Sequence, residues 1–291
     1  MEYAEIGIIG GSGFYDLEGL EGAHAVQLRT PFGAPSEKLM LGKLHGRSVA
    51  FLSRHGHGHR LNPSEVNYRA NLFAMKKLKV EHLISITAVG SLKEELKPGE
   101  LVIPDQYADQ TFKREKTFFE DGLVAHVSLA DPTCPILGPL AFRLAGETGL
   151  PAHLGGTYCN MEGPQFSSRA ESLANRMLGH ALIGMTQAVE AKLARELEMC
   201  FLPLAFVTDY DCWHQDEESV SVEMVIANLN QGVARIKQLL PRLIRELPRQ
   251  RGACSCANSL AAAMITAPIM IPERTYKKLE IIIGKYIKSR I

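Results

Sequence analysis

Short apolar runs recur along the chain, and several of them stop at glycine, threonine or charged residues. A run of this kind is typical of a buried strand that ends at a surface. The sequence therefore predicts strands at residues 6–9, 48–52, 82–86, 101–103, 181–183 and 201–207.

Apolar residues at helical spacing lie between many of these runs. Because strands that alternate with helices build a layered sheet, the pattern predicts an α/β fold with functional loops at the strand ends. The longest helical pattern contains Pro241, where we expect the helix to kink or divide. Helices are expected after Pro63, from Ser168 to Met177, from Val189 to Met199 and from Glu217 to Leu247.

Composition and charge exclude several classes of partner. The chain of 291 residues is 46% hydrophobic, which is enough for a sizeable core. Lys and Arg total 32, as do Asp and Glu, so the formal net charge is zero and a general nucleic-acid surface is not expected. No run reaches membrane-spanning length without a charge, and the first residues lack a basic stretch. We therefore expect a cytoplasmic protein with no nucleic-acid and no membrane partner.

The last part of the chain differs in composition from the rest. We expect residues 1–247 to form one domain and residues 248–291 to form an appendage with an amphipathic helix after Arg274. The appendage contains Cys254-Ser255-Cys256, a close-set pair that suits a redox or disulfide role. No metal site is expected there, because no second Cys or His pair stands at suitable spacing nearby.

The ends of the first two strands suggest an anion site. Gly10-Gly11-Ser12-Gly13 lets backbone N–H groups approach an anion, although a tight structural turn is the alternative. Arg54 suits a bidentate grip on phosphate, with His55 beside it. His55, His57 and His59 also invite a zinc interpretation, which the intervening glycines and flanking arginines disfavour.

Other strand ends carry hydroxyl and carboxyl groups. Thr87 and Thr186 each follow an apolar run, and the run at 201–207 stops at Thr208-Asp209-Tyr210-Asp211. Ligands of open α/β sheets bind at this edge. Asp209 and Asp211 are therefore predicted either to bind a polar heterocycle or to act as an acid/base pair. The alternative is a turn in which the two aspartates hydrogen-bond to their own backbone.

Five motifs occurring together resemble the 5'-methylthioadenosine phosphorylases, which belong to the trimeric purine nucleoside phosphorylases. The resemblance covers about residues 6–247 and implies a single domain with a central mixed, partly barrel-like sheet flanked by helices. The motifs are Ile8-Ile9-Gly10-Gly11-Ser12-Gly13, Arg54-His55-Gly56, Pro63-Ser64-Glu65-Val66-Asn67-Tyr68, Glu162-Gly163-Pro164-Gln165-Phe166-Ser167-Ser168-Arg169-Ala170-Glu171 and Thr208-Asp209-Tyr210-Asp211-Cys212-Trp213.

The resemblance also implies a role for each candidate residue. Asp209 and Asp211 would be catalytic, and together with Phe166 and Ser167 would surround the purine, while Met185 would lie against the ribose. Val222, Val225 and Ile226 share a helix face that would line an apolar 5'-methylthio pocket, where ordinary core packing is the alternative. His126 would enter the site of a neighbouring subunit. Phosphate would be held by Ser12, Arg54, His55, Thr87, Ala88 and Thr186.

Some positions depart from the family pattern. Gly184 stands where relatives often have Asn, which removes a side chain and could alter substrate breadth. Gln165 replaces a frequent Arg and Ser12 a frequent Thr, and both keep hydrogen-bonding ability. The CxC pair and the extended tail are similar to those of thermophilic members that use disulfides.

The expected reaction is reversible phosphorolysis of 5'-methylthioadenosine to adenine and 5-methylthioribose 1-phosphate, in purine and methionine salvage. Asp209, desolvated against Phe166 and close to phosphate, is expected to have a raised pKa and to donate to purine N7, while Asp211 accepts from the 6-amino group. No cofactor is expected, since phosphate is a co-substrate, and a homo-oligomer is expected, with a trimer favoured over a hexamer.

Three alternatives remain open at this point. A purine nucleoside phosphorylase would act on adenosine, inosine, guanosine or methylthioinosine. A non-catalytic nucleoside- or phosphate-binding protein would keep the glycine loop but would not need Asp209. A histidine-dependent metallohydrolase would not depend on phosphate.

Overall fold

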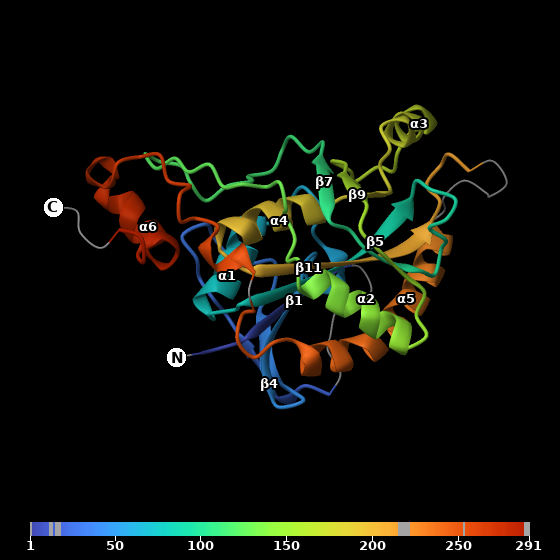
Figure 1. Cartoon of the computed structure of the whole chain (residues 1–291), viewed down its shortest axis with the longest axis horizontal. Coiled ribbons are helices and arrows are strands. Elements are labelled where there is room, and N and C mark those ends of the chain that lie inside the picture. The colour runs from blue at the N-terminus through green and yellow to red at the C-terminus, as the bar shows by residue number, and fades with distance from the viewer. Residues whose placement is uncertain (1, 12–13, 15–18, 215–221, 253, 288–291) are drawn as a thin grey trace.

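The computed structural model describes residues 2–11, 14, 19–214, 222–252 and 254–287, with the backbone alone for 222–227. A central sheet of 11 strands has helices on both faces (Figure 1). The helices are α1 (Tyr68–Lys77), α2 (Leu137–Glu147), α3 (Arg169–Met177), α4 (Gln187–Glu196), α5 (Val222–Glu246) and α6 (Glu273–Ile283). The strands are β1 (Ile6–Gly10), β2 (Glu21–Val26), β3 (Leu39–Leu44), β4 (Arg47–Ser53), β5 (His82–Ser91), β6 (Leu101–Ile103), β7 (Gln106–Asp109), β8 (Ala152–Leu154), β9 (Thr157–Asn160), β10 (Leu182–Gly184) and β11 (Cys200–Asp209).

The expected mixed sheet is confirmed. Its strand order is β2-β3-β4-β1-β5-β10-β9-β7, and a branch from β5 continues through β11 and β6 to β8. The β1, β4, β5 and β11 pairings are parallel, whereas β10 pairs with β5, and β6 with β11, in the antiparallel sense. The sheet branches without closing into a full barrel.

The branch at β5 creates a gap in the sheet. On one side, β11 follows β5 from His82 to Gly90. On the other side, β1 pairs only as far as Ser85, and β10 pairs only from Gly90 onward. Residues 86–89 therefore face an opening between two strands, and such a switch point is where α/β sheets bind ligands.

Alternating residues of the central strands supply two separate cores. Ile9, Leu83 and Phe201 pack on the face that α1 and α4 cover. Ile8, Ile84 and Leu202 pack on the opposite face, against α2 and α5. Because side chains alternate across a strand, one continuous apolar run serves both layers.

Several predicted elements are longer or more regular than expected. β5 and β11 extend past the predicted ends, so Thr87, Thr208 and Asp209 lie within strands instead of after them. The predicted division of the long helix is wrong, since α5 continues through Pro241. The predicted cap is confirmed, because the Ser168 hydroxyl accepts a hydrogen bond from the backbone N–H of Glu171 in a capping box.

The segment after residue 247 shares the core of the rest of the chain. Leu260, Leu279 and Ile283 are fully buried in the same cluster as α1 and α4 residues. Figure 1 shows α6 beside this layer, at the end of the molecule away from α3. The helices of the described residues are all too short or too polar to cross a membrane.

The packing of α6 predicts very different losses of stability for two nearby substitutions. Leu279→Ala should lower the free energy of unfolding by about 2–5 kcal/mol, because its side chain is buried. Ile281→Ala on the same helix should cost far less, since that side chain is 46% exposed. Equal midpoints for the two variants in urea unfolding would contradict the structural role of α6.

Candidate functional site

A pocket of about 810 Å³ opens at the gap beside β5. The ends of β1, β4, β5, β10 and β11 form its floor, and α5 closes one side. Its walls are lined by Gly11, Arg54, His55, His59, Arg60, Asn62, Pro63, Glu65, Thr87, Ala88, Val89, Gly90, Met161, Pro164, Phe166, Ile183, Gly184, Met185, Thr186, Thr208, Asp209, Asp211, Leu229 and Asn230.

Arg54 lies fully buried at one end of the pocket, in a pair with Glu190 of α4. Its Nε and Nη2 donate to the two carboxylate oxygens of Glu190 at 2.5 and 3.0 Å. Nη1 donates to the carbonyl of Ile86, and Nη2 also donates to Ser85 Oγ, both at 3.0 Å. The guanidinium thus joins the end of β4 to β5 and to α4.

These contacts correct the predicted role of Arg54. The four hydrogen bonds occupy four of the five N–H donors of a guanidinium. A bidentate grip on phosphate is therefore wrong for this arrangement, because the fork is already matched to a carboxylate. Arg54 can offer the pocket one remaining N–H and its positive charge.

His55 lies next to Arg54 and is held in one tautomer. Its Nδ1 donates to the carbonyl of Leu61 at 2.9 Å, because a carbonyl can only accept. Burial, followed by the charge of Arg54, lowers the pKa of His55 to about 3. The ring is therefore neutral at physiological pH, and it stacks on His59 with centroids 4.3 Å apart.

The remaining groups at this end of the pocket come from β1, β5 and α4. Thr87 and Ala88 lie in the stretch of β5 that neither β1 nor β10 covers. Thr186 Oγ1 is buried with no hydrogen-bond partner among the described residues, so it is available to a ligand oxygen. A side chain on Gly11 would approach Arg54 Nη1 within 2.8 Å, which explains the glycine there. Ser12 lies outside the described residues.

The two aspartates line the same pocket, at and just after the end of β11. Asp209 accepts hydrogen bonds from the Thr208 hydroxyl at 2.7 Å and from the Asp211 N–H at 2.8 Å. Asp211 has a φ of 52°, a left-handed conformation that aspartate tolerates. The turn and the carboxylate pair were alternatives in the sequence, and the structure contains both.

Asp211 is also buried beside the pocket. Burial raises the pKa of Asp211, and the nearby Ser172 and Ser167 hydroxyls and Cys212 N–H oppose that rise. Its buried Oδ2 has no partner at hydrogen-bond distance among the described residues. This oxygen can accept a hydrogen bond from a ligand amino group.

The apolar walls of the pocket include two of the predicted contacts. Phe166, 48% exposed, and Met185 both line it. Ser167 lies just behind, where its carbonyl accepts a hydrogen bond from Cys212 Sγ. The side chains of Val222, Val225 and Ile226 lie outside the described residues, but Leu229 lines the pocket one turn further along α5.

Gly184 is explained by Tyr158 of β9. A side chain at Gly184 would overlap the Tyr158 hydroxyl and ring. Tyr158 is fully buried, and its hydroxyl accepts a hydrogen bond from the Thr186 N–H at 3.4 Å. An internal tyrosine therefore fills the space beside Gly184, at the end of β10.

Two other predicted features lie apart from the pocket or differ in form. His126 is exposed, and its backbone N–H donates to the carbonyl of Ala263 at 2.8 Å. The segment 57–59 forms a 3₁₀ turn around Gly58, so the three histidines do not share one face of an extended strand. Among the described residues, these histidines do not form a group close enough to hold a metal ion.

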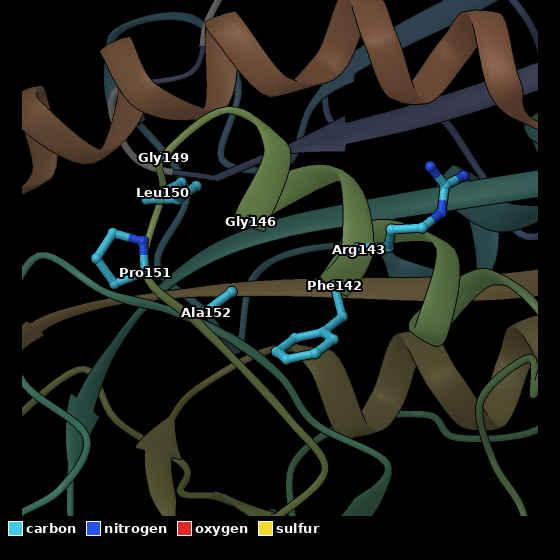
Figure 2. A pocket seen from close by; sticks show the side chains of 7 residues that line it. All are labelled: Phe142, Arg143, Gly146, Gly149, Leu150, Pro151 and Ala152. Atoms are coloured by element: carbon cyan, nitrogen blue, oxygen red, sulfur yellow. The ribbon is translucent and has the colours of Figure 1, made fainter.

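A smaller hollow of about 430 Å³ lies near the C-terminal end of α2. Figure 2 shows it between α2 and the segment that follows, with Arg143 pointing away from the other lining side chains. Arg143 is already paired with Glu147 and Glu246 on the surface. This hollow has no convergent set of polar groups, so the pocket beside β5 is the candidate site.

Comparisons with known proteins show the family of the chain. The model of the Phosphorylase superfamily matches residues 5–245. An S-methyl-5'-thioadenosine phosphorylase of Geobacter sulfurreducens is 50% identical over 283 residues, covering 97% of this chain and 99% of that protein. The chain belongs to the methylthioadenosine phosphorylase family of this superfamily.

Further members of the family are similar over nearly the whole chain. An S-methyl-5'-thioadenosine phosphorylase of Synechocystis is 48% identical and covers 98% of this chain and 89% of that protein. A crystal structure of a methylthioadenosine phosphorylase from an antarctic soil metagenomic library has a TM-score of 0.92 at 43% identity, covering 97% of this chain and 99% of that one. The Schistosoma mansoni methylthioadenosine phosphorylase in complex with adenine has a TM-score of 0.80 at 35% identity, covering 83% and 91%.

Three supporting residues of this family member were not assigned a role from the sequence. Glu190 was visible only as a polar residue in a helix, and Tyr158 belongs to a strand that the sequence did not predict. Arg114 is buried and donates to the carbonyls of Met185 and Glu162 beneath the pocket. Their partners are distant in the chain, so local spacing carries no signal for them.

The buried ion pair gives a prediction for stability. Glu190→Gln leaves the charge of Arg54 buried without its carboxylate, and the free energy of unfolding should fall by about 3–5 kcal/mol. Glu147→Gln breaks a half-exposed pair with Arg143 and should change the free energy of unfolding by less than about 1 kcal/mol. Urea unfolding of both variants tests this, and equal effects would contradict it.

The contact at Gly184 gives a second prediction. Gly184→Ala should lower the free energy of unfolding by about 1–3 kcal/mol through overpacking against Tyr158. Gly146→Ala in α2 meets no atom within 4 Å and should be neutral or stabilising. If thermal unfolding showed Gly184→Ala to be as benign as Gly146→Ala, Tyr158 would not fix this position.

Proposed function

We propose that this protein catalyses the reversible phosphorolysis of 5'-methylthioadenosine to adenine and 5-methylthioribose 1-phosphate. The observation that carries the proposal is one pocket lined by both the buried Arg54 and the Asp209–Asp211 pair. The names of relatives at about half identity over the full chain support the same substrate. The reaction makes the chain a pentosyltransferase of purine and methionine salvage.

In the proposed reaction, a phosphate oxygen attacks C1' of the ribose while the C1'–N9 bond breaks. The bonding electrons go to the purine, which leaves as an anion and needs a proton or hydrogen bond at N7. Arg54, His55, Thr87, Ala88 and Thr186 would hold phosphate beneath the ribose, together with Ser12. The charge of Arg54 and the unpartnered Thr186 hydroxyl support this placement. Phosphate is a co-substrate, and the proposal requires no cofactor or metal.

At the base end, we assign Asp209 to N7 and Asp211 to the 6-amino group. The free Oδ2 of Asp211 supports the second assignment, because an amino group is a donor that this oxygen lacks. Phe166 and Ser167 would surround the purine, and Met185 would lie against the ribose. Leu229 extends the face of α5 that Val222, Val225 and Ile226 would present to the methylthio group.

Adenosine is a plausible slower substrate of the same site. An apolar pocket discriminates a methylthio group from a hydroxyl only by about 1–3 kcal/mol. Related Schistosoma mansoni structures are named adenosine/methylthioadenosine phosphorylase, which supports this breadth. Inosine and guanosine should be poorer, because their 6-oxo group would face the Asp211 carboxylate.

The oligomeric state and location are part of the proposal. We propose a homotrimer, which we favour over a hexamer. In this trimer, His126 completes the pocket of a neighbouring subunit. His126 is exposed and is not among the residues that line the pocket of its own chain, which supports this role. A cytoplasmic location agrees with the cysteines, all six of which are free thiols here. The redox or disulfide role expected for Cys254 and Cys256 from the sequence is untested.

Replacing Asp209 tests the catalytic assignment. Asp209→Asn should lower kcat for 5'-methylthioadenosine by about 10²–10⁴-fold, the usual contribution of a general acid. Asp121→Asn is the control, because Asp121 is exposed and has a φ of 56° that Asn accommodates. The measurement is phosphate-dependent release of adenine. Full turnover by Asp209→Asn would remove this residue from the mechanism, and release without phosphate would refute the phosphorylase itself.

A further inference from the structure

Four cysteines from distant parts of the chain meet on the α2 and α5 side of the sheet, away from the pocket. Cys134 precedes α2, Cys200 begins β11, and Cys254 and Cys256 follow α5. Their sulfur atoms all lie within 4.8 Å of one another. In the sequence, no second pair of ligands stands at suitable spacing near the CxC pair. The fold supplies this second pair by bringing Cys134 and Cys200 to Cys254 and Cys256.

The arrangement of the sulfur atoms matches a tetrahedral metal site. A Zn–S bond of about 2.3 Å gives edges of about 3.8 Å between the sulfurs of a tetrahedron. Here Cys200 Sγ and Cys254 Sγ are 3.5 Å apart, and none of the other distances within the cluster exceeds 4.8 Å. Two disulfides would instead place the sulfurs in two pairs at about 2.0 Å. The observed set is one group of four.

The surroundings of the cluster suit thiolate ligands. Cys134, Cys200 and Cys256 are buried, so solvent has little access to a bound ion. The Cys134 thiol lies next to the backbone N–H groups of Ile136 and Leu137. These two N–H groups lie at the N-terminal end of α2, where the helix dipole favours negative charge.

A cation lies next to the cluster as well. Arg195 of α4 donates through Nη1 to Cys256 Sγ at 3.8 Å. Four thiolates around a divalent ion carry a net charge of about −2, which is costly to bury. Arg195 and the N-terminus of α2 therefore offset charge at the place where such a complex would hold it.

We propose that Cys134, Cys200, Cys254 and Cys256 bind one zinc ion in a closed tetrahedral site. Binding breaks four S–H bonds, forms four Zn–S bonds and releases four protons to solvent, with no change of oxidation state. A four-sulfur tetrahedral site favours zinc or iron, and the absence of an open position makes the site structural and not catalytic. The ion would fasten the segment after α5 to β11 and to the start of α2.

The direct test is the metal content of the full chain. Protein purified without chelator from zinc-supplemented cells should contain about one zinc per chain by atomic emission. Cys134→Ser and Cys256→Ser should each reduce this content at least tenfold and lower the melting temperature. Cys159→Ser, which removes a buried cysteine outside the cluster, should leave the zinc content unchanged.

A second measurement does not depend on whether the variants fold. Exchange of the bound metal for cobalt in the unmodified protein should give thiolate-to-cobalt charge-transfer absorption and the visible bands of tetrahedral cobalt.

Cys256→His, which keeps a zinc ligand, should retain more metal than Cys256→Ser.

Several outcomes would overturn the proposal. Stoichiometric iron would refute the choice of metal. Metal-free protein whose mass is lower by the hydrogens of one or two disulfides would show that the cluster is a disulfide site. Four titratable thiols with no bound metal, after incubation with excess zinc, would show that the cluster is an ordinary cysteine core.

Discussion

The fold around the pocket depends on the buried pair between Arg54 and Glu190. A guanidinium with no exposed surface is stable only if its charge and its donors are satisfied. Glu190 supplies the charge, while Ser85 and the Ile86 carbonyl accept the other hydrogen bonds. Because these groups come from β4, β5 and α4, the pair fixes three elements that are far apart in the chain.

The pocket exists because β5 changes partners along its length. β1 leaves β5 after Ser85, β10 joins it at Gly90, and the backbone between them faces an opening. Arg54, after β4, and Asp209 and Asp211, at the end of β11, line the pocket at this opening. A buried guanidinium and two carboxylates thus line one pocket at this gap.

The local parts of this arrangement could be predicted from the sequence. The runs before Arg54 and Asp209 are apolar enough to predict buried strands, and both residues line the pocket as expected. The bidentate role of Arg54 was wrong because its partner, Glu190, is 136 residues away. The division of the helix at Pro241 was also wrong, since packing on the sheet holds α5 in one piece.

The sequence by itself determined the α/β class, most central strands, the cap at Ser168 and the polar groups at the strand ends. Each depends on residues close together in the chain, where periodicity and turn chemistry act directly. The tertiary structure alone decided the partner of Arg54, the filling of the Gly184 position by Tyr158 and the meeting of Cys134 and Cys200 with the CxC pair. These contacts join residues tens of positions apart or more, and only the packed sheet and its covering helices bring them within bonding distance.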